Sequence, residues 1–129
     1  MLTGRVTSDR EAVVPIDVLD VEGHPTCVKA TLDTGYDGFL TLPSSLIEEL
    51  GLPLIGPAKA ALGDGNEVSM NLFLGSVRWD DGIVDVLVLE AEGGILVGMA
   101  MLAGCRVTMD VEEDGAISIE TLDQIRSVN

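Results

Sequence analysis

An aspartate stands at the end of an apolar stretch, in the segment "KATLDTGYDGFLTLP" of residues 29–43. Asp33 follows Leu32 and is itself followed by Thr34 and Gly35. A carboxylate beside a hydrophobic core costs free energy unless it is paired or hydrogen-bonded. Asp33 is therefore either a turn residue that reaches solvent or a group placed for chemistry. Because Asp and Gly favour turns, the triplet alone does not decide between these two interpretations.

The residues around this segment are expected to form a single domain with an aliphatic core. The chain has 129 residues, which is the size of one domain and is enough to bury a core. Hydrophobic residues make up 47% of it, so a folded rather than a disordered chain is expected. Aromatic residues make up only 3%, and the core must therefore consist of Val, Leu, Ile, Ala and Met.

The charge of the chain argues against two classes of partner. The acidic residues number 22 and the Lys and Arg residues 7, which gives a formal net charge of -15. Nucleic-acid binding depends on the neutralisation of phosphates by Lys and Arg, so no nucleic-acid partner is expected. Anionic membrane surfaces are argued against on the same ground. Two copies of this chain would also repel each other.

The first residues and the apolar runs predict a cytoplasmic protein. The segment "MLTGRVTSDREAVV" lacks the basic and then apolar pattern of a secretory signal. The longest apolar run, Ile95–Ala103, is too short to cross a bilayer, so no membrane partner is expected. In a reducing compartment, Cys27 and Cys105 are expected to be buried free thiols rather than a disulfide.

Turn residues divide most of the chain into short strands. The apolar patterns and the intervening Gly, Asp and Asn residues predict a series of hairpins, one with its tip at residues 63–66. The predicted strands lie within residues 12–21, 26–32, 38–42, 58–74, 76–79, 83–90, 95–98 and 105–120.

One short helix is predicted after Pro43, because proline suits the start of a helix. Ser45 and Glu48 have the spacing of a capping box, and Gly51 is expected to end the helix. A second short helix is predicted just before Gly104.

The segment "DVEEDGAISIE" has acidic residues at a spacing close to that of a calcium-binding loop. Asp110, Asp114 and Gly115 fall at the expected places, but Thr121 stands where the loop needs a bidentate acid. Alternating strand patterns flank the segment, where a calcium loop has helices. A hairpin turn is therefore the preferred interpretation, and no metal site is predicted.

The context of Asp33 repeats in the second half of the chain. In the first half a strand leads through the Asp33 triplet to a strand and a helix; in the second half a strand leads through Gly93 and Gly94 to "ILVGMAML". A flap-like hairpin lies between the halves. With these motifs the chain resembles the retropepsin-like aspartic proteases, in particular the small single-domain bacterial members. The likeness extends from "LTGRV" near the start to "VTMDVEEDGAISI" near the end.

The resemblance implies an all-β fold: a closed retropepsin-like barrel with one or two short helices, formed by residues 1–120. Residues 121–129 would be a tail that either pairs with a partner or is loose. Only one Asp-Thr-Gly triplet occurs in the chain, so the resemblance implies a homodimer in which each copy supplies one triplet to a shared site.

The resemblance also implies a role for each residue of the site. Asp33 from each copy would form the catalytic dyad, Thr34 would lock the two loops together, and Gly35 would let the backbone approach a substrate. Tyr36 and Asp37 would complete the catalytic loop. Gly98 would hold the second-half strand against that loop. The flap over a bound peptide would comprise Leu62, Gly63, Asp64, Gly65 and Asn66.

Such a dyad has a clear chemistry. Two carboxylates about 3 Å apart cannot both be ionised, so they share one proton. The ionised carboxylate takes a proton from water while the protonated one polarises the peptide carbonyl, so no metal or cofactor is expected. The alternative is a non-catalytic domain of the same fold that binds or scaffolds a peptide or protein. Tyr36, where retroviral and pepsin-like enzymes have a small residue, and Met99, where retroviral enzymes have an arginine, keep that alternative open.

Overall fold

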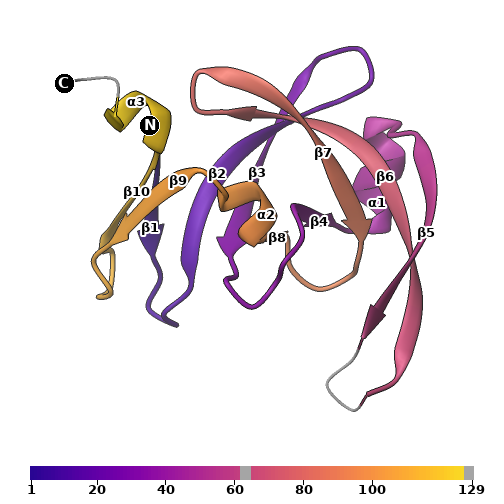
Figure 1. Cartoon of the computed structure of the whole chain (residues 1–129), viewed down its shortest axis with the longest axis horizontal. Coiled ribbons are helices and arrows are strands. Elements are labelled where there is room, and N and C mark those ends of the chain that lie inside the picture. Colours follow the sequence, from indigo (N-terminus) through magenta and orange to yellow (C-terminus); the bar gives the residue numbers. More distant parts are fainter. Residues whose placement is uncertain (62–64, 127–129) are drawn as a thin grey trace.

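A computed structural model describes residues 1–61 and 65–126 of the chain as a mainly β structure, which confirms the predicted fold class at that level (Figure 1). Ten strands form a single sheet in the order β5-β6-β7-β4-β8-β3-β2-β1-β10-β9. The elements are β1 (Leu2–Val6), β2 (Ala12–Leu19), β3 (Pro25–Leu32), β4 (Leu40–Leu42), α1 (Ser44–Leu50), β5 (Leu54–Ala61), β6 (Glu67–Trp79), β7 (Gly82–Glu90), β8 (Leu96–Val97), α2 (Met99–Leu102), β9 (Cys105–Met109), β10 (Ala116–Thr121) and α3 (Leu122–Arg126).

Strand alternation builds the core. Side chains on a strand point to opposite faces in turn, so β2 buries Val14, Ile16 and Val18, while β3 buries Val28 and Ala30. The core is aliphatic as predicted, with one tryptophan. Its buried members are Val6, Val14, Ile16, Val18, Val28, Ala30, Leu40, Leu42, Ile47, Leu50, Leu52, Val77, Trp79, Val86, Val88, Val97, Met101, Leu102, Ile117 and Ile119.

The two similar halves of the sequence pair with each other reciprocally. The first-half strand β3 runs parallel to β8, and the second-half strand β7 runs parallel to β4. The two short strands then meet antiparallel, with Leu40 opposite Val97. Each half thus supplies one long strand and one short strand to the centre of the sheet. The repeat in the sequence therefore corresponds to reciprocal pairing of strands between the two halves. This pairing places β8 beside the end of β3.

The remaining pairings arrange the ends of the sheet. β2 also pairs with β6, through residues 17–19 and 76–78, so two strands distant in the sheet order are joined directly. β1, β10 and β9 extend the sheet beyond β2 and lie at the left of Figure 1, whereas β5 and α1 lie at the right. The predicted hairpins β2–β3, β5–β6, β6–β7 and β9–β10 are all present as antiparallel pairs.

Helix α1 corrects one prediction and confirms another. Pro43 is the N-cap residue and makes no side-chain cap, so the predicted capping box is wrong. The carboxylate of Glu92 caps the helix instead. Its Oε1 accepts hydrogen bonds from the backbone N–H of Ser44 at 3.1 Å and from the hydroxyl of Ser44 at 2.7 Å. Gly51 ends the helix with a φ of 69°, as predicted.

Two further predictions concern the cysteines and the end of the chain. Both cysteines are free thiols, but Cys27 is exposed and Cys105 only half-buried, so their predicted burial is wrong. The reason is the strand period: Cys27 precedes the buried Val28 and therefore points outward. Residues 121–129, predicted to be a tail, include the last residue of β10, Thr121, and the short helix α3. Among the described residues, no helix is long and apolar enough to span a membrane.

Candidate functional site

Asp33 lies where β3 ends, and β8 holds its backbone. Its N–H donates to the carbonyl of Val97 at 2.9 Å, which continues the parallel pairing of β3 with β8. Its carboxylate turns back over the loop, because Oδ1 accepts the N–H of Gly35 at 2.9 Å. Tyr36 closes the turn with a bond from its N–H to the carbonyl of Asp33 at 3.2 Å. The carboxylate therefore has a fixed direction and is half-buried at the end of a strand.

The start of α2 fixes the rest of the loop. The N–H of Met99 donates to the carbonyl of Tyr36 at 2.7 Å, and that of Ala100 donates to the carbonyl of Gly38 at 3.1 Å. The first N–H groups of a helix have no partner within it, so the loop carbonyls satisfy them. One contact thus completes both the helix end and the loop that carries Asp33.

Gly98 makes this close approach feasible. A Cβ at this position would collide with the carbonyl oxygen of Gly38 and would lie 2.7 Å from the carbonyl oxygen of Tyr36. Because both obstacles are backbone atoms, neither can move aside cheaply. The structure therefore places Gly98 against the Asp33 loop, which is the position that the sequence predicts for it.

The ring of Tyr36 packs within this loop. It lies against the Cα of Gly38 on one side and of Gly98 on the other, where added side chains would meet its atoms. It is half-buried, and burial raises the pKa of its phenol, with the negative charge of Asp37 as a second cause. The bulky residue after the triplet thus has its own space in the loop, between two glycines.

A buried threonine holds β8 in place from the other side. Thr41 is only 3% exposed, and its Oγ1 accepts the N–H of Leu96 at 2.8 Å and donates to the carbonyl of Gly94 at 3.2 Å. This hydroxyl ties the segment before β8 to β4. Since β8 carries the carbonyl that fixes Asp33, Thr41 contributes indirectly to the geometry of the loop.

The Asp33 loop faces a cavity of about 690 Å³. Asp33 and Thr34 supply polar groups, whereas β9 supplies a mainly apolar wall from alternate residues that share one face. Met99 is 48% exposed beside them. The lining residues are Arg10, Glu11, Ala12, Thr31, Leu32, Asp33, Thr34, Met99, Leu102, Cys105, Val107 and Met109.

The structure brings the predicted loop residues and Gly98 together, and it describes the predicted flap residues only in part. Leu62, Gly63 and Asp64 lie outside the described residues. Gly65 is described and has a φ of 87°, which suits the turn, and Asn66 precedes β6. The β5–β6 hairpin that would carry the flap is paired from Leu54 to Ala61.

Sequence reasoning missed the residues that line the cavity opposite the Asp33 loop. Arg10 comes from the turn between β1 and β2, and the apolar wall comes from β9. The period of β9 signals that Cys105, Val107 and Met109 share a face. No local signal indicates that this face lies next to Asp33, because that contact depends on the long-range pairing of β10 with β1.

The site contains one aspartate, Asp33, whose backbone and carboxylate are both held by hydrogen bonds. No group of three or more His, Cys, Asp or Glu side chains able to hold a metal ion occurs in the part of the chain that the structure describes. The structure offers a positioned carboxylate beside a cavity whose β9 wall is mainly apolar. No protein-family model matches this chain, and no curated protein sequence matches it.

Proposed function

We propose that the chain is a homodimeric aspartic endopeptidase with a retropepsin-like closed barrel, in which Asp33 of each copy supplies one carboxylate of the dyad. The observation that carries the proposal is the bracing of the Asp33 loop. A simple turn needs only its own bonds, yet this loop is fixed by Val97, by Gly98 and by the first N–H groups of α2. Such pre-organisation is what a reacting group requires.

The reaction would use both copies of Asp33. The ionised carboxylate takes a proton from water as the water oxygen bonds to the peptide carbonyl carbon, and the protonated carboxylate gives its proton to the carbonyl oxygen. The tetrahedral diol then loses its C–N bond: the protonated carboxylate gives its proton to the leaving nitrogen, and the ionised carboxylate takes a proton from one diol hydroxyl, which becomes the carbonyl of the product acid. Each step conserves charge within the pair, so no further reactant is required.

The cavity suits an apolar part of a peptide substrate. Met99, Leu102, Val107 and Met109 form an apolar surface within the same cavity as the carboxylate of Asp33. Burying an apolar side chain there contributes about 25 cal/mol for each Å² removed from water. We therefore expect cleavage next to apolar residues.

Thr34 supports the homodimer. Its side chain is exposed and makes no hydrogen bond to any other described residue, so it is available to the loop of a second copy. The net charge of -15 opposes association, and this repulsion acts over about 10 Å at 0.1 M salt. Salt and mild acid should therefore favour the dimer.

The alternative is a peptide-binding domain without catalysis, and the exposed apolar surface of the cavity favours it. Met99 and Met109 are 48% and 37% exposed, and flexible methionines suit surfaces that accept varied partners. Such a domain would bind apolar peptides as a single chain and would not need the Asp33 carboxylate.

Substitution of Asp33 by asparagine separates the two functions. If the proposal holds, Asp33→Asn abolishes cleavage of a peptide library, keeps the fold and retains peptide binding. The matched control is Glu113→Gln, which removes one negative charge from an exposed turn far along the sequence and should leave cleavage unchanged. Cleavage by Asp33→Asn at the wild-type rate would refute the enzyme.

A further inference from the structure

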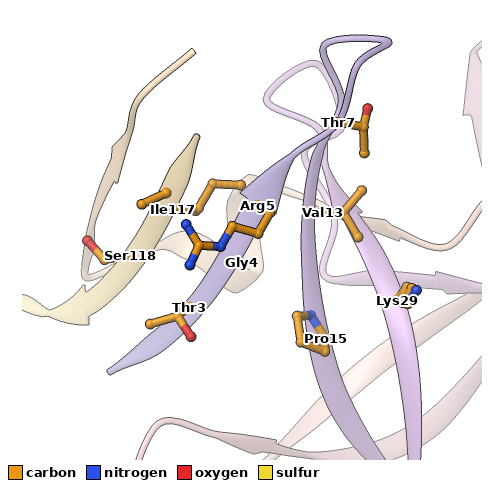
Figure 2. Close-up of a pocket in the computed structure, with 10 residues that line it drawn as sticks. Thr3, Gly4, Arg5, Thr7, Val13, Pro15, Lys29, Ile117 and Ser118 are labelled. Atoms are coloured by element: carbon orange, nitrogen blue, oxygen red, sulfur yellow. The ribbon is translucent and has the colours of Figure 1, made fainter. Parts of the chain in front are cut away.

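A second concave surface lies on the outer face of β10, β1, β2 and β3. It has a volume of about 630 Å³ and shares no lining residue with the Asp33 cavity. Figure 2 shows Thr3 and Arg5 on β1, Val13 and Pro15 on β2, and Lys29 on β3 around it. The other lining residues are Gly4, Thr7, Ala116, Ile117 and Ser118. We call this surface the β1–β2 groove.

The phase of the β1–β2 ladder explains where the groove opens. Thr7 donates its N–H to the carbonyl of Glu11 at 2.9 Å, so this is a hydrogen-bonded pair. Hydrogen-bonded pairs recur at every second residue of an antiparallel ladder. Arg5 and Val13, which are register partners, form the next such pair.

The pair after that would be Thr3 with Pro15, and the register ends before it. Proline has no N–H, so Pro15 cannot donate to the carbonyl of Thr3. β1 and β2 diverge from this point, and β2 continues beside β3, where Pro15 lies opposite Lys29. The groove therefore opens where Pro15 has no N–H to continue the ladder, and it leaves the backbone of Thr3 beside the open space.

The charge of the groove is opposite to that of the molecule. The described residues that line it include Arg5 and Lys29 but no acidic residue, in a chain whose formal net charge is -15. Arg5 donates to the carbonyl of Asp114 at 3.4 Å, a long bond to an uncharged group. In the part of the chain that the structure describes, no carboxylate lies within ion-pair distance of either cation.

We propose that the β1–β2 groove binds an acidic peptide segment of a partner protein in an extended conformation. Charge complementarity identifies the ligand as an anion, since two cations with no carboxylate within ion-pair distance in the described part of the chain line one concave surface. The shape identifies an extended chain, because most lining residues are exposed or half-buried side chains along neighbouring strands rather than the walls of an enclosed cavity. Val13 and Pro15 supply an apolar floor between the cations.

The positions of the cations predict the spacing of the acids. Arg5 and Lys29 lie two strands and one side-chain repeat apart, which places their Cα atoms roughly 12 Å apart. Both side chains are long and flexible, so a bound ligand can draw their charges closer together. An extended peptide with Glu at alternate positions presents its carboxylates on one face about 7 Å apart, so two or three of them can reach both cations.

Fluorescence anisotropy with labelled Glu-Val-Glu-Val-Glu tests the proposal, and the protein used carries Asp33→Asn so that it cannot cleave the probe. Arg5→Gln and Lys29→Gln should each weaken binding about threefold to fivefold, as expected for exposed ion pairs. Lys59→Gln and Arg106→Gln are matched controls, because they change the net charge equally outside the groove. They should leave the affinity within about twofold, since distant exposed charges are screened.

Three results would overturn the proposal. Equal binding of Gln-Val-Gln-Val-Gln would show that charge is not recognised, and equal losses in the control variants would show that the groove is not the site. Binding of inorganic phosphate without binding of the Glu peptide at about 1 mM would identify a small-anion site instead. The outcome is independent of the proposed peptidase, because none of these readouts requires cleavage.

Discussion

Asp20 and Asp33 form the same local motif in different surroundings. Each follows the last residue of a strand, and each accepts an N–H from the residue two positions later, Glu22 for Asp20 and Gly35 for Asp33, at 2.9 Å. Asp20 accepts a second N–H from His24 at 2.8 Å, and this bond is the main reason that its pKa is lowered. Local hydrogen bonds therefore occur in both turns.

The difference lies in what covers the two turns. One backbone bond, from Val21 to the carbonyl of Leu50, joins the Asp20 turn to another element. The Asp33 loop is joined to β8, Gly98 and the start of α2 and faces the cavity lined by β9. The local hydrogen bonds of the Asp33 turn are therefore not unusual. Its contacts with β8, Gly98 and α2, all from the second half of the chain, distinguish it from the Asp20 turn.

The largest expected effect comes from substituting one glycine beside each turn: Gly98, which packs against the Asp33 loop, and Gly23, which lies in the Asp20 turn. Gly98→Ala should lower the free energy of unfolding by about 3 kcal/mol, because the added Cβ meets backbone oxygens that cannot move aside. Gly23→Ala, in the Asp20 turn, should cost about 1 kcal/mol, because its φ of 88° disfavours alanine while the space is open. Urea unfolding followed by the fluorescence of Trp79 measures both. Equal costs would mean that the two turns are equivalent.

A smaller effect is expected at the threonine that holds β8. Thr41→Val keeps the shape but leaves the N–H of Leu96 without its acceptor, which should cost about 1–2 kcal/mol. Ser76→Ala removes an exposed hydroxyl that bonds Asp85 at 2.7 Å and should cost less than about 0.5 kcal/mol. The same unfolding assay compares them. An unchanged free energy of unfolding in Thr41→Val would show that the hydroxyl does not fix β8.

The smallest effect concerns the phenol in the Asp33 loop. Tyr36 is the chain's one tyrosine, so absorbance at about 295 nm follows its ionisation alone. Its pKa should lie above the ordinary value of about 10. The neutral phenol then stabilises the fold fully below pH 10, and this contribution is lost as pH rises through the folded pKa.

Asp37→Asn sharpens this measurement. It removes the secondary cause of the shift, the charge of Asp37, and leaves the main one, burial. The pKa of Tyr36 should therefore fall only part of the way. A pKa of 10 or below in the wild-type protein would mean that the ring is not packed between Gly38 and Gly98.

The sequence predicted the parts of this molecule that depend on local patterns. Alternating strands, their hairpin turns and the end of α1 at Gly51 follow from side-chain period and backbone freedom. The partner of α1's first turn, Glu92, could not be predicted, because it comes from a loop 48 residues away. The β1–β2 groove could not be predicted, although Pro15 is visible in the sequence. Its missing N–H matters only if Pro15 falls at a hydrogen-bonded position of the β1–β2 ladder, and the sequence does not give that register.

The candidate site divides in the same way. The Asp33 triplet and Gly98 each belong to a short motif next to a strand, so the sequence alone suggests both as candidates, and the structure brings them into contact. The β9 wall of the cavity depends on β10 pairing with β1, a contact between residues more than a hundred positions apart. Burial of Cys27 was predicted from its apolar neighbours, whereas the period of β3 places it outside.

The stoichiometry of a statine-containing peptide tests the central claim most directly, because statine mimics the tetrahedral intermediate of peptide hydrolysis. The measurement is titration calorimetry at raised salt and about pH 5. Both conditions favour the dimer, because they reduce the repulsion between the two copies. The account predicts one peptide bound for every two chains, with binding greatly weakened by Asp33→Asn. One peptide bound per chain, with an affinity unchanged by Asp33→Asn, would contradict a shared dyad.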